Sequence, residues 1–341
     1  MKCIHCHTDS KYAARTNRSC PKCQHQFAFE PKAGDPLTDG AFQAALERIS
    51  SGGTVRFTDR NLYYEIVRRT QHRSKALPWV LAALAVFSLL LGVFASAFFF
   101  FPAGLLSIAT IITWPGKLAK LSFTQFSRHL GRWNQVHGVP KGLIVRKEPA
   151  QGPLVRALPP DIQHYSFDRA VVTDRAETVD LLLANNFHFE NNCAVLSVDG
   201  YPEPAFDVVR GMLKNNPKLA VYVLHDATPK GCSLAGHLAT NDWFQPSASI
   251  VDVGLAPEHA RPFRGCWQVA GEWTAASGAG WLAHYSLELA VVRPEQIIKR
   301  LFRALSNTDR LVRGGGELYF VDSGAFSSDA SASDGGGDSF G

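Results

Sequence analysis

Residues 169–226 contain three short apolar runs that decide the fold: RAVVTD (169–174), NCAVLSVDG (192–200) and LAVYVLHD (219–226). Two amphipathic stretches separate them, AETVDLLLANN (176–186) and EPAFDVVRGMLKNN (203–216). Continuous apolar runs of this length are typical of strands buried on both faces, and intervening helices provide the crossovers of a parallel sheet. The sequence therefore predicts an α/β fold with a mostly parallel sheet and crossover helices.

The pattern continues towards the C-terminus. GCSLAGHLATN (231–241) predicts another helix, and HYSLELAVVRP (284–294) followed by EQIIKRLFRAL (295–305) predicts a last strand and helix. We expect this domain to span residues 161–322. The tail 323–341 is rich in Gly, Ser and Asp, a composition that predicts disorder because it cannot bury a core.

Polar residues follow each of the three runs. Asp174 follows the first, Asp199 the second, and His225-Asp226 the third. The carboxyl ends of parallel strands form the crevice where α/β sheets bind ligands, and carboxylates there can hold Mg²⁺. The alternative is that these side chains only satisfy the backbone of the loops.

These motifs, in this order, resemble the Toprim domain of the topoisomerase VI A subunit and the meiotic double-strand-break transesterase. The resemblance runs from Val171 to Gly231. Gly200-Tyr201-Pro202 matches the family's G-Y-P turn, and Asp226, Pro229 and Gly231 match its D-x-D-P-x-G motif, whose carboxylates hold Mg²⁺ near the DNA backbone.

The resemblance implies a set of site residues and also a defect. The second aspartate of D-x-D-P-x-G is Thr228 here, and the family's first glutamate falls near Thr173 or Asp174. We therefore expect a degenerate Mg²⁺ site, at which Lys230 and His225 would instead favour an anion. The implied magnesium ligands are Asp174, Glu177 and Asp226. Asp174 and Asp226 are also the implied catalytic candidates of this domain. The implied cofactor-binding residues are Gly200, Lys230 and Gly231.

A second likeness to this family lies upstream, in FTDRNLYY (57–64), which contains its R-x-x-Y-Y signature. The resemblance implies Tyr64 as a catalytic nucleophile and Arg60 as a positive clamp. The segment 38–72 predicts a helix–turn–helix-like unit, but an uncharged stretch follows it too soon to leave room for a complete winged helix. The alternative is that Tyr63 and Ile66 only pack the two helices.

Two C-x-x-C pairs near the N-terminus predict a zinc ribbon over residues 1–30. The pairs are Cys3/Cys6 and Cys20/Cys23, and together they supply a tetrahedral set of four thiolates for structural Zn²⁺. Three further cysteines make an odd total of seven, which argues against a disulfide framework and for a reducing compartment. The ribbon either contacts nucleic acid or protein, or only folds a segment that lacks a core.

The stretch 76–116 predicts a transmembrane segment, because no charged residue occurs between Lys75 and Lys117. Basic residues flank it on both sides, which favours a hairpin with both ends in the cytoplasm over a single span. We therefore expect the bacterial inner membrane as the location. A basic connector over 117–160 then leads to the α/β domain.

The net charge of +5 is weak evidence for nucleic acid, since part of the excess flanks the apolar stretch. We expect a membrane-anchored Toprim-like protein that binds or senses nucleic acid or nucleotides, with weak or absent enzymatic activity. One alternative is an inactive membrane scaffold that binds proteins through its zinc ribbon and α/β domain. The other is a Mg²⁺-dependent nuclease or topoisomerase-like transesterase. The expected partners are the lipid bilayer, DNA or another nucleic acid, and other proteins.

Overall fold

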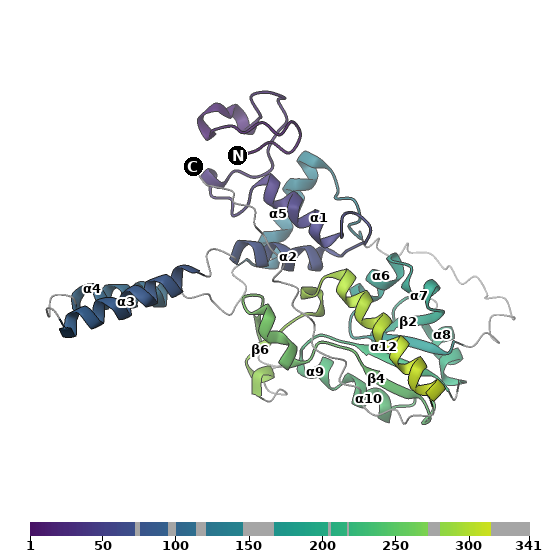
Figure 1. Ribbon diagram of the computed structural model, residues 1–341. Helices are drawn as coiled ribbons and strands as arrows, with labels where there is room; N and C mark the ends of the chain where they lie inside the picture. Colours follow the sequence, from purple (N-terminus) through teal and green to yellow (C-terminus); the bar gives the residue numbers. More distant parts are fainter. Residues whose placement is uncertain are drawn as a thin grey trace. The chain divides into compact units, whose positions relative to one another are not determined.

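The computed structural model describes residues 1–71, 76–94, 100–113, 121–145, 167–203, 206–216, 218–271 and 280–314 (Figure 1). The chain divides into two compact units. Unit 1 comprises Met1–Val145 and Arg264–Val269, and unit 2 comprises Arg146–Phe263 and Ala270–Gly341. The predicted tail 323–341 and residues 146–160 of the predicted connector lie outside the described residues.

The described part of unit 1 is helical apart from one short strand. Its elements are the 3₁₀ turns η1 (Tyr12–Ala14), η2 (Thr16–Arg18) and η3 (Pro31–Ala33), the helices α1 (Asp39–Ile49), α2 (Asp59–Gln71), α3 (Ala76–Phe94), α4 (Phe100–Thr113) and α5 (Phe123–His137), and the strand β5 (Gln268–Val269).

Unit 2 alternates strands with helices. Its elements are β1 (Arg169–Thr173), α6 (Ala176–Ala184), α7 (Phe187–Glu190), β2 (Cys193–Ser197), α8 (Phe206–Lys214), β3 (Ala220–Leu224), α9 (Pro229–Cys232), α10 (Leu234–Thr240), β4 (Ser249–Asp252), η6 (Pro257–Phe263), η7 (Gly280–Ala283), β6 (Tyr285–Ser286), η8 (Leu289–Val291) and α12 (Pro294–Gly314).

One buried carboxylate joins the N-terminal segment of unit 1 to its helices. Thr38 caps α1 by accepting a hydrogen bond from the Ala41 amide, and Asp39 follows in the first turn. Asp39 is fully buried and accepts hydrogen bonds from the amides of Ala28 and Phe29 at 3.0 and 2.8 Å. This attachment fixes the segment that follows the cysteine pairs against the start of α1.

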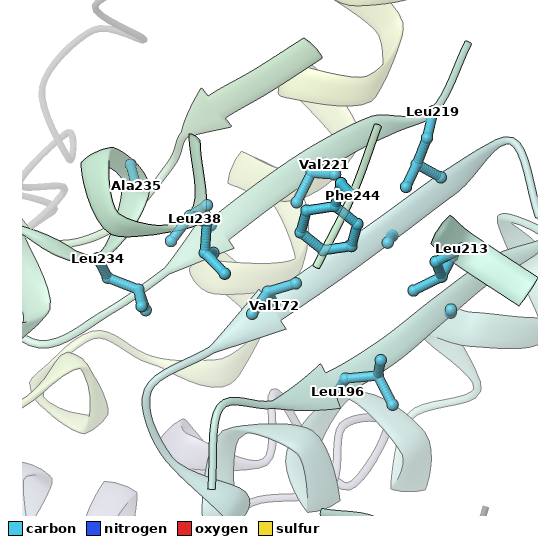
Figure 2. Close-up of a cluster of buried hydrophobic side chains, with 12 residues drawn as sticks. Val172, Leu196, Leu213, Leu219, Val221, Leu234, Ala235, Leu238 and Phe244 are labelled. Atoms are coloured by element: carbon cyan, nitrogen blue, oxygen red, sulfur yellow. The ribbon is translucent and has the colours of Figure 1, made fainter. Parts of the chain in front are cut away.

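The sheet of unit 2 has four parallel strands in the order β2-β1-β3-β4. Val172, Leu196 and Val221 lie on one face, where Leu213 of α8 and Leu238 of α10 cover them (Figure 2). This confirms the predicted α/β fold with a parallel sheet. The buried runs quoted above form β1, β2 and β3.

The fourth strand differs from the prediction. It is β4, whereas residues 284–294 form only the two-residue strand β6 and the turn η8. Leu287 instead exchanges antiparallel backbone hydrogen bonds with Ala227, beyond the end of β3. The residues of β4 are all half-buried and include Ser249 and Asp252, so this edge strand lacks the continuous apolar run that marks the others.

The apolar stretch of unit 1 forms α3 and α4, which lie side by side (Figure 1). Among the described residues, no helix is both long and apolar enough to cross a membrane. The predicted transmembrane hairpin over 76–116 is therefore wrong. The stretch is divided between helices of 19 and 14 residues, and at about 1.5 Å per residue the second reaches about 21 Å, short of the roughly 30 Å hydrocarbon core of a bilayer.

Candidate functional site

The carboxyl ends of β1, β2 and β3 border a cleft of about 560 Å³ in unit 2. Its lining combines five acidic side chains with two basic ones. It includes six of the residues expected there from sequence, namely Asp174, Glu177, Asp199, Asp226, Lys230 and Gly231, and further includes Arg175, Ala176, Tyr201, Glu203 and Thr228.

Asp174 and Asp226 meet at the ends of two paired strands. Thr173 and Leu224 are partners in the β1–β3 register, so the next residues along both strands are close. The Asp226 amide donates to Oδ2 of Asp174 at 2.8 Å. Parallel pairing thus brings together two carboxylates that are far apart in the sequence.

Arg175 fills the space beside these carboxylates. Its Nε donates to Oδ2 of Asp226, and its Nη2 lies 3.3 Å from Oε1 of Glu288. The second oxygen of Asp226 accepts a hydrogen bond from the Leu289 amide at 2.7 Å. Both oxygens of Asp226 are therefore engaged by protein donors, and its side chain is only 3% exposed.

Among the described residues of the cleft, no three carboxylates lie close enough together to share one ion. Among the described residues, the only group of three or more possible ligands close enough to share one ion is the cysteine cluster. Burial raises the pKa of Asp174. Burial and the negative charge of Asp174 also raise the pKa of Asp226, against the opposing effect of Arg175. An arginine thus supplies the compensating charge in this crevice.

Two positions of the D-x-D-P-x-G motif have local structural roles. Thr228, at the position of the second aspartate, caps α9 by accepting a hydrogen bond from the Gly231 amide at 3.0 Å. A Cβ atom at Gly231 would lie 2.3 Å from the Asp226 carbonyl oxygen, so only glycine fits. Gly200, in the G-Y-P turn, has φ of +85°, which likewise favours glycine.

Behind the cleft, His225 bridges β3 and β4. Its Nε2 lies 3.0 Å from Oδ1 of Asp252, and its Nδ1 lies 2.8 Å from the Asp226 carbonyl oxygen. Both partners are acceptors, so both ring nitrogens donate when the imidazole is protonated. Although burial alone opposes the charge, the hydrogen bond and charge of Asp252 raise the pKa of His225.

We expect Asp252→Asn to destabilise the protein in a pH-dependent way. The pKa of His225 is higher in the folded protein than the unfolded value of about 6.5, so the charged pair stabilises the fold fully below pH 6.5. This stabilisation is lost as the pH rises through the folded pKa. Removing the charge should cost about 1–3 kcal/mol at pH 6 and much less at pH 9. Urea unfolding of wild type and variant at both pH values measures this. An equal cost at both would exclude a charged His225–Asp252 pair.

Tyr64 and Arg60 belong to unit 1, where Tyr64 is fully buried. The Tyr64 hydroxyl accepts a hydrogen bond from Nε2 of Gln268 at 2.7 Å, and the Arg60 guanidinium lies 3.9 Å from the centroid of the Phe123 ring. Tyr63 donates to the Leu121 carbonyl oxygen at 2.7 Å. In this conformation the R-x-x-Y-Y residues pack the helices, and the Tyr64 hydroxyl is not presented to solvent.

The four N-terminal cysteines come together in unit 1 and could hold a metal ion, with their sulfur atoms within 4.8 Å of one another. The Cys3–Cys23 and Cys6–Cys20 sulfur pairs are 3.7 and 3.6 Å apart. The edge of a tetrahedron with metal–sulfur bonds of about 2.3 Å is about 3.8 Å, so the spacing fits four-coordinate binding.

Hydrogen bonds in the two C-x-x-C turns favour thiolates at Cys6 and Cys20. At Cys23 the His25 amide acts in the same direction, but burial and hydrogen bonds with the other three thiols raise the pKa to about 12. The side chain and backbone of Thr8 hydrogen-bond to Cys6 and lower its pKa to about 6. The backbone amides of Cys23 and Lys22 lower the pKa of Cys20. Thiolate is the form that binds a metal, so this part of the sequence prediction, a possible metal-binding cysteine cluster, is confirmed.

Sequence reasoning missed three residues of the cleft region: Arg175, Asp252 and Glu288. Arg175 follows Asp174 directly, and a basic residue next to a strand-end acid is the one local signal that could have indicated an ion pair. Asp252 and Glu288 had no such signal, because their partners are far away in the sequence.

Comparison with known proteins assigns this chain to no family. No family model matches the sequence, and no curated protein is significantly similar to it. The resemblance to Toprim domains therefore rests on the motifs alone.

Proposed function

We propose that this protein binds nucleic acid and that its α/β unit is a Toprim-like domain in which an ion pair has replaced the metal site. The observation that carries the replacement of the metal site is Arg175, which lies against Asp226 and Glu288 in the strand-end crevice. A positive guanidinium in that position supplies the charge that Mg²⁺ would otherwise bring, and its own charge repels the ion.

We propose that nucleic acid binds to the cysteine unit, the N-terminal segment around Cys3, Cys6, Cys20 and Cys23, and not to the cleft. The cleft has five acidic and two basic side chains, which disfavours direct contact with phosphates. Lys2, Lys11, Arg18 and Lys22 are exposed around the cysteines, while the exposed carboxylate of Asp9 pairs with the terminal amine. We infer that the cysteines hold zinc, since four thiolates in tetrahedral spacing suit that ion.

A titration with Mg²⁺ tests the inactive site. We expect wild type to bind Mg²⁺ only at millimolar concentrations, and Arg175→Ala to bind it at least about tenfold more tightly because a nearby positive charge is removed. The control Arg210→Ala alters an exposed arginine of α8 that pairs with Asp207. It should leave Mg²⁺ binding unchanged. Calorimetry on the full chains measures all three.

The second candidate function is Mg²⁺-dependent phosphodiester chemistry, and the carboxylate of Asp174 is the observation that favours it. Oδ1 of Asp174 is buried and has no hydrogen-bond partner among the described residues, so it remains available to a cation. Micromolar Mg²⁺ binding by wild type, together with cleavage of DNA, would support this candidate and contradict the proposal above.

Binding to an oligonucleotide tests the nucleic-acid role. Affinity for single-stranded and duplex DNA should fall steeply with salt, and Lys11→Gln/Lys22→Gln should reduce the slope of log K against log salt by roughly 1–2. Lys299→Gln is the matched control, since this exposed lysine of α12 pairs with Glu295 in unit 2. Fluorescence anisotropy of the full chains gives the slopes. A salt-independent affinity, or equal slopes for all three proteins, would remove the cysteine unit from the proposal.

A further inference from the structure

Helices α3 and α4 bury small side chains between them and expose large ones. Ala85 and Ser88 of α3 and Ala103 of α4 are 8%, 8% and 4% exposed. The large apolar side chains are each between 47% and 73% exposed. They are Val80, Leu84, Val86, Phe87, Leu89, Leu90 and Val93 on α3, and Phe101, Leu105 and Ile108 on α4.

This arrangement is the reverse of a helix pair that packs in water. In water the large apolar residues form the stripe between helices and polar residues face outward. Small residues at the contact and large apolar residues outside are typical of helices surrounded by lipid, where close backbone approach holds the pair together. Proteins that stay monomeric in water rarely expose so many large apolar side chains on two adjacent helices.

The distribution of exposed apolar side chains around α3 distinguishes contact with lipid from contact with a second protein. At about 100° per residue, the exposed positions from Val80 to Val93 fall on most of the helix circumference, and Ala85 and Ser88 mark the sector against α4. A second copy of this chain would cover one stripe of the helix. Acyl chains can cover all of it.

The hydroxyl groups of α4 fit the same surroundings. Ser107 donates to the Ala103 carbonyl oxygen at 2.8 Å, and Thr110 donates to the Leu106 carbonyl oxygen at 2.7 Å. These bonds within the helix leave neither hydroxyl in need of water, which lowers the cost of burying it in an apolar medium.

Basic residues flank the pair in the sequence, and their charge complements an anionic surface. Residues 60–75 contain five basic residues and one acidic residue, a net charge of +4, and residues 117–132 contain four basic residues and no acidic one, again +4. We propose that the α3–α4 pair is a lipid-contacting surface, whose apolar side chains lie among acyl chains while the flanking basic segments lie at anionic headgroups. Contact of this kind requires no passage across the bilayer.

Flotation with vesicles tests the surface. The full chain is synthesised in the presence of vesicles of phosphatidylcholine alone, or of vesicles in which phosphatidylglycerol replaces part of it. We expect wild type to float with both and more completely with the anionic ones. Phe87→Asp/Phe101→Asp should reduce the floating fraction roughly tenfold or more, since carboxylates are costly among acyl chains. Phe189→Asp is the matched control, because Phe189 of α7 is 84% exposed but lies outside the pair.

Three results would overturn the proposal. Wild type could stay in the dense fraction with both kinds of vesicle, or the double variant could float as well as wild type. A soluble wild-type oligomer that the double variant dissociates, seen by sedimentation, would instead assign the surface to a second copy. The bound metal content of the double variant, compared with wild type, verifies that the cysteine unit remains folded.

Discussion

Replacing Cys20 and Cys23 together by serine is expected to abolish metal binding and to unfold the N-terminal segment around the four cysteines. A buried apolar cluster there consists of Cys3, Cys20 and Phe27, so half of the metal set is also part of the small core around the metal site. Binding of structural zinc by four ligands is worth about 10–16 kcal/mol in small zinc units, which far exceeds what so few side chains can supply. Elemental analysis of the purified chain and limited proteolysis measure the two effects.

The matched control uses a cysteine outside the cluster. Cys232 lies in α9 of unit 2, and Cys232→Ala should keep the full metal content. Because the amides of Ala28 and Phe29 are held by Asp39, we expect proteolysis of the double variant to stop near this attachment. Full metal retention in Cys20→Ser/Cys23→Ser would show that other residues hold the ion.

Asp226→Ala is expected to destabilise unit 2 by about 2–3 kcal/mol, less than the usual cost of removing one partner of a fully buried ion pair, because water screens the 36% exposed Arg175 side chain. The substitution leaves the Arg175 guanidinium without its closest carboxylate and the Leu289 amide without its acceptor. Relief of the repulsion between Asp226 and Asp174 offsets part of this cost. Urea unfolding of the full chain, followed through the transition of unit 2, measures the difference.

Two comparison variants make the result specific. Asp199→Ala removes an exposed carboxylate that lines the same cleft, and should change stability by less than about 0.5 kcal/mol. Arg175→Met/Asp226→Ala should recover part of the loss, because no guanidinium is then left without its closest carboxylate. If Asp226→Ala costs no more than Asp199→Ala, the Arg175–Asp226 pair does not stabilise the fold.

The local sequence pattern was sufficient to predict the features that depend on residues close together in the chain. The apolar runs that became β1, β2 and β3 are continuous because both faces of each of these strands are buried, and this leaves a direct trace in the residues. The spacing of the four cysteines works in the same way, since two residues between thiols set the reach of each turn. The strand β4 has no such trace, because its residues are only half-buried and do not all need apolar side chains.

Contacts between distant segments decided the rest. The motif around Asp226 fits a metal site as well as an ion pair, and the choice depends on Arg175 and Glu288, which the fold brings to the same carboxylate. Likewise, the uncharged stretch 76–116 predicts burial but not the division into α3 and α4 or the direction of their large side chains. A sequence records which residues avoid water, whereas the partner of a charge or an apolar face is set by segments that meet only when the chain folds.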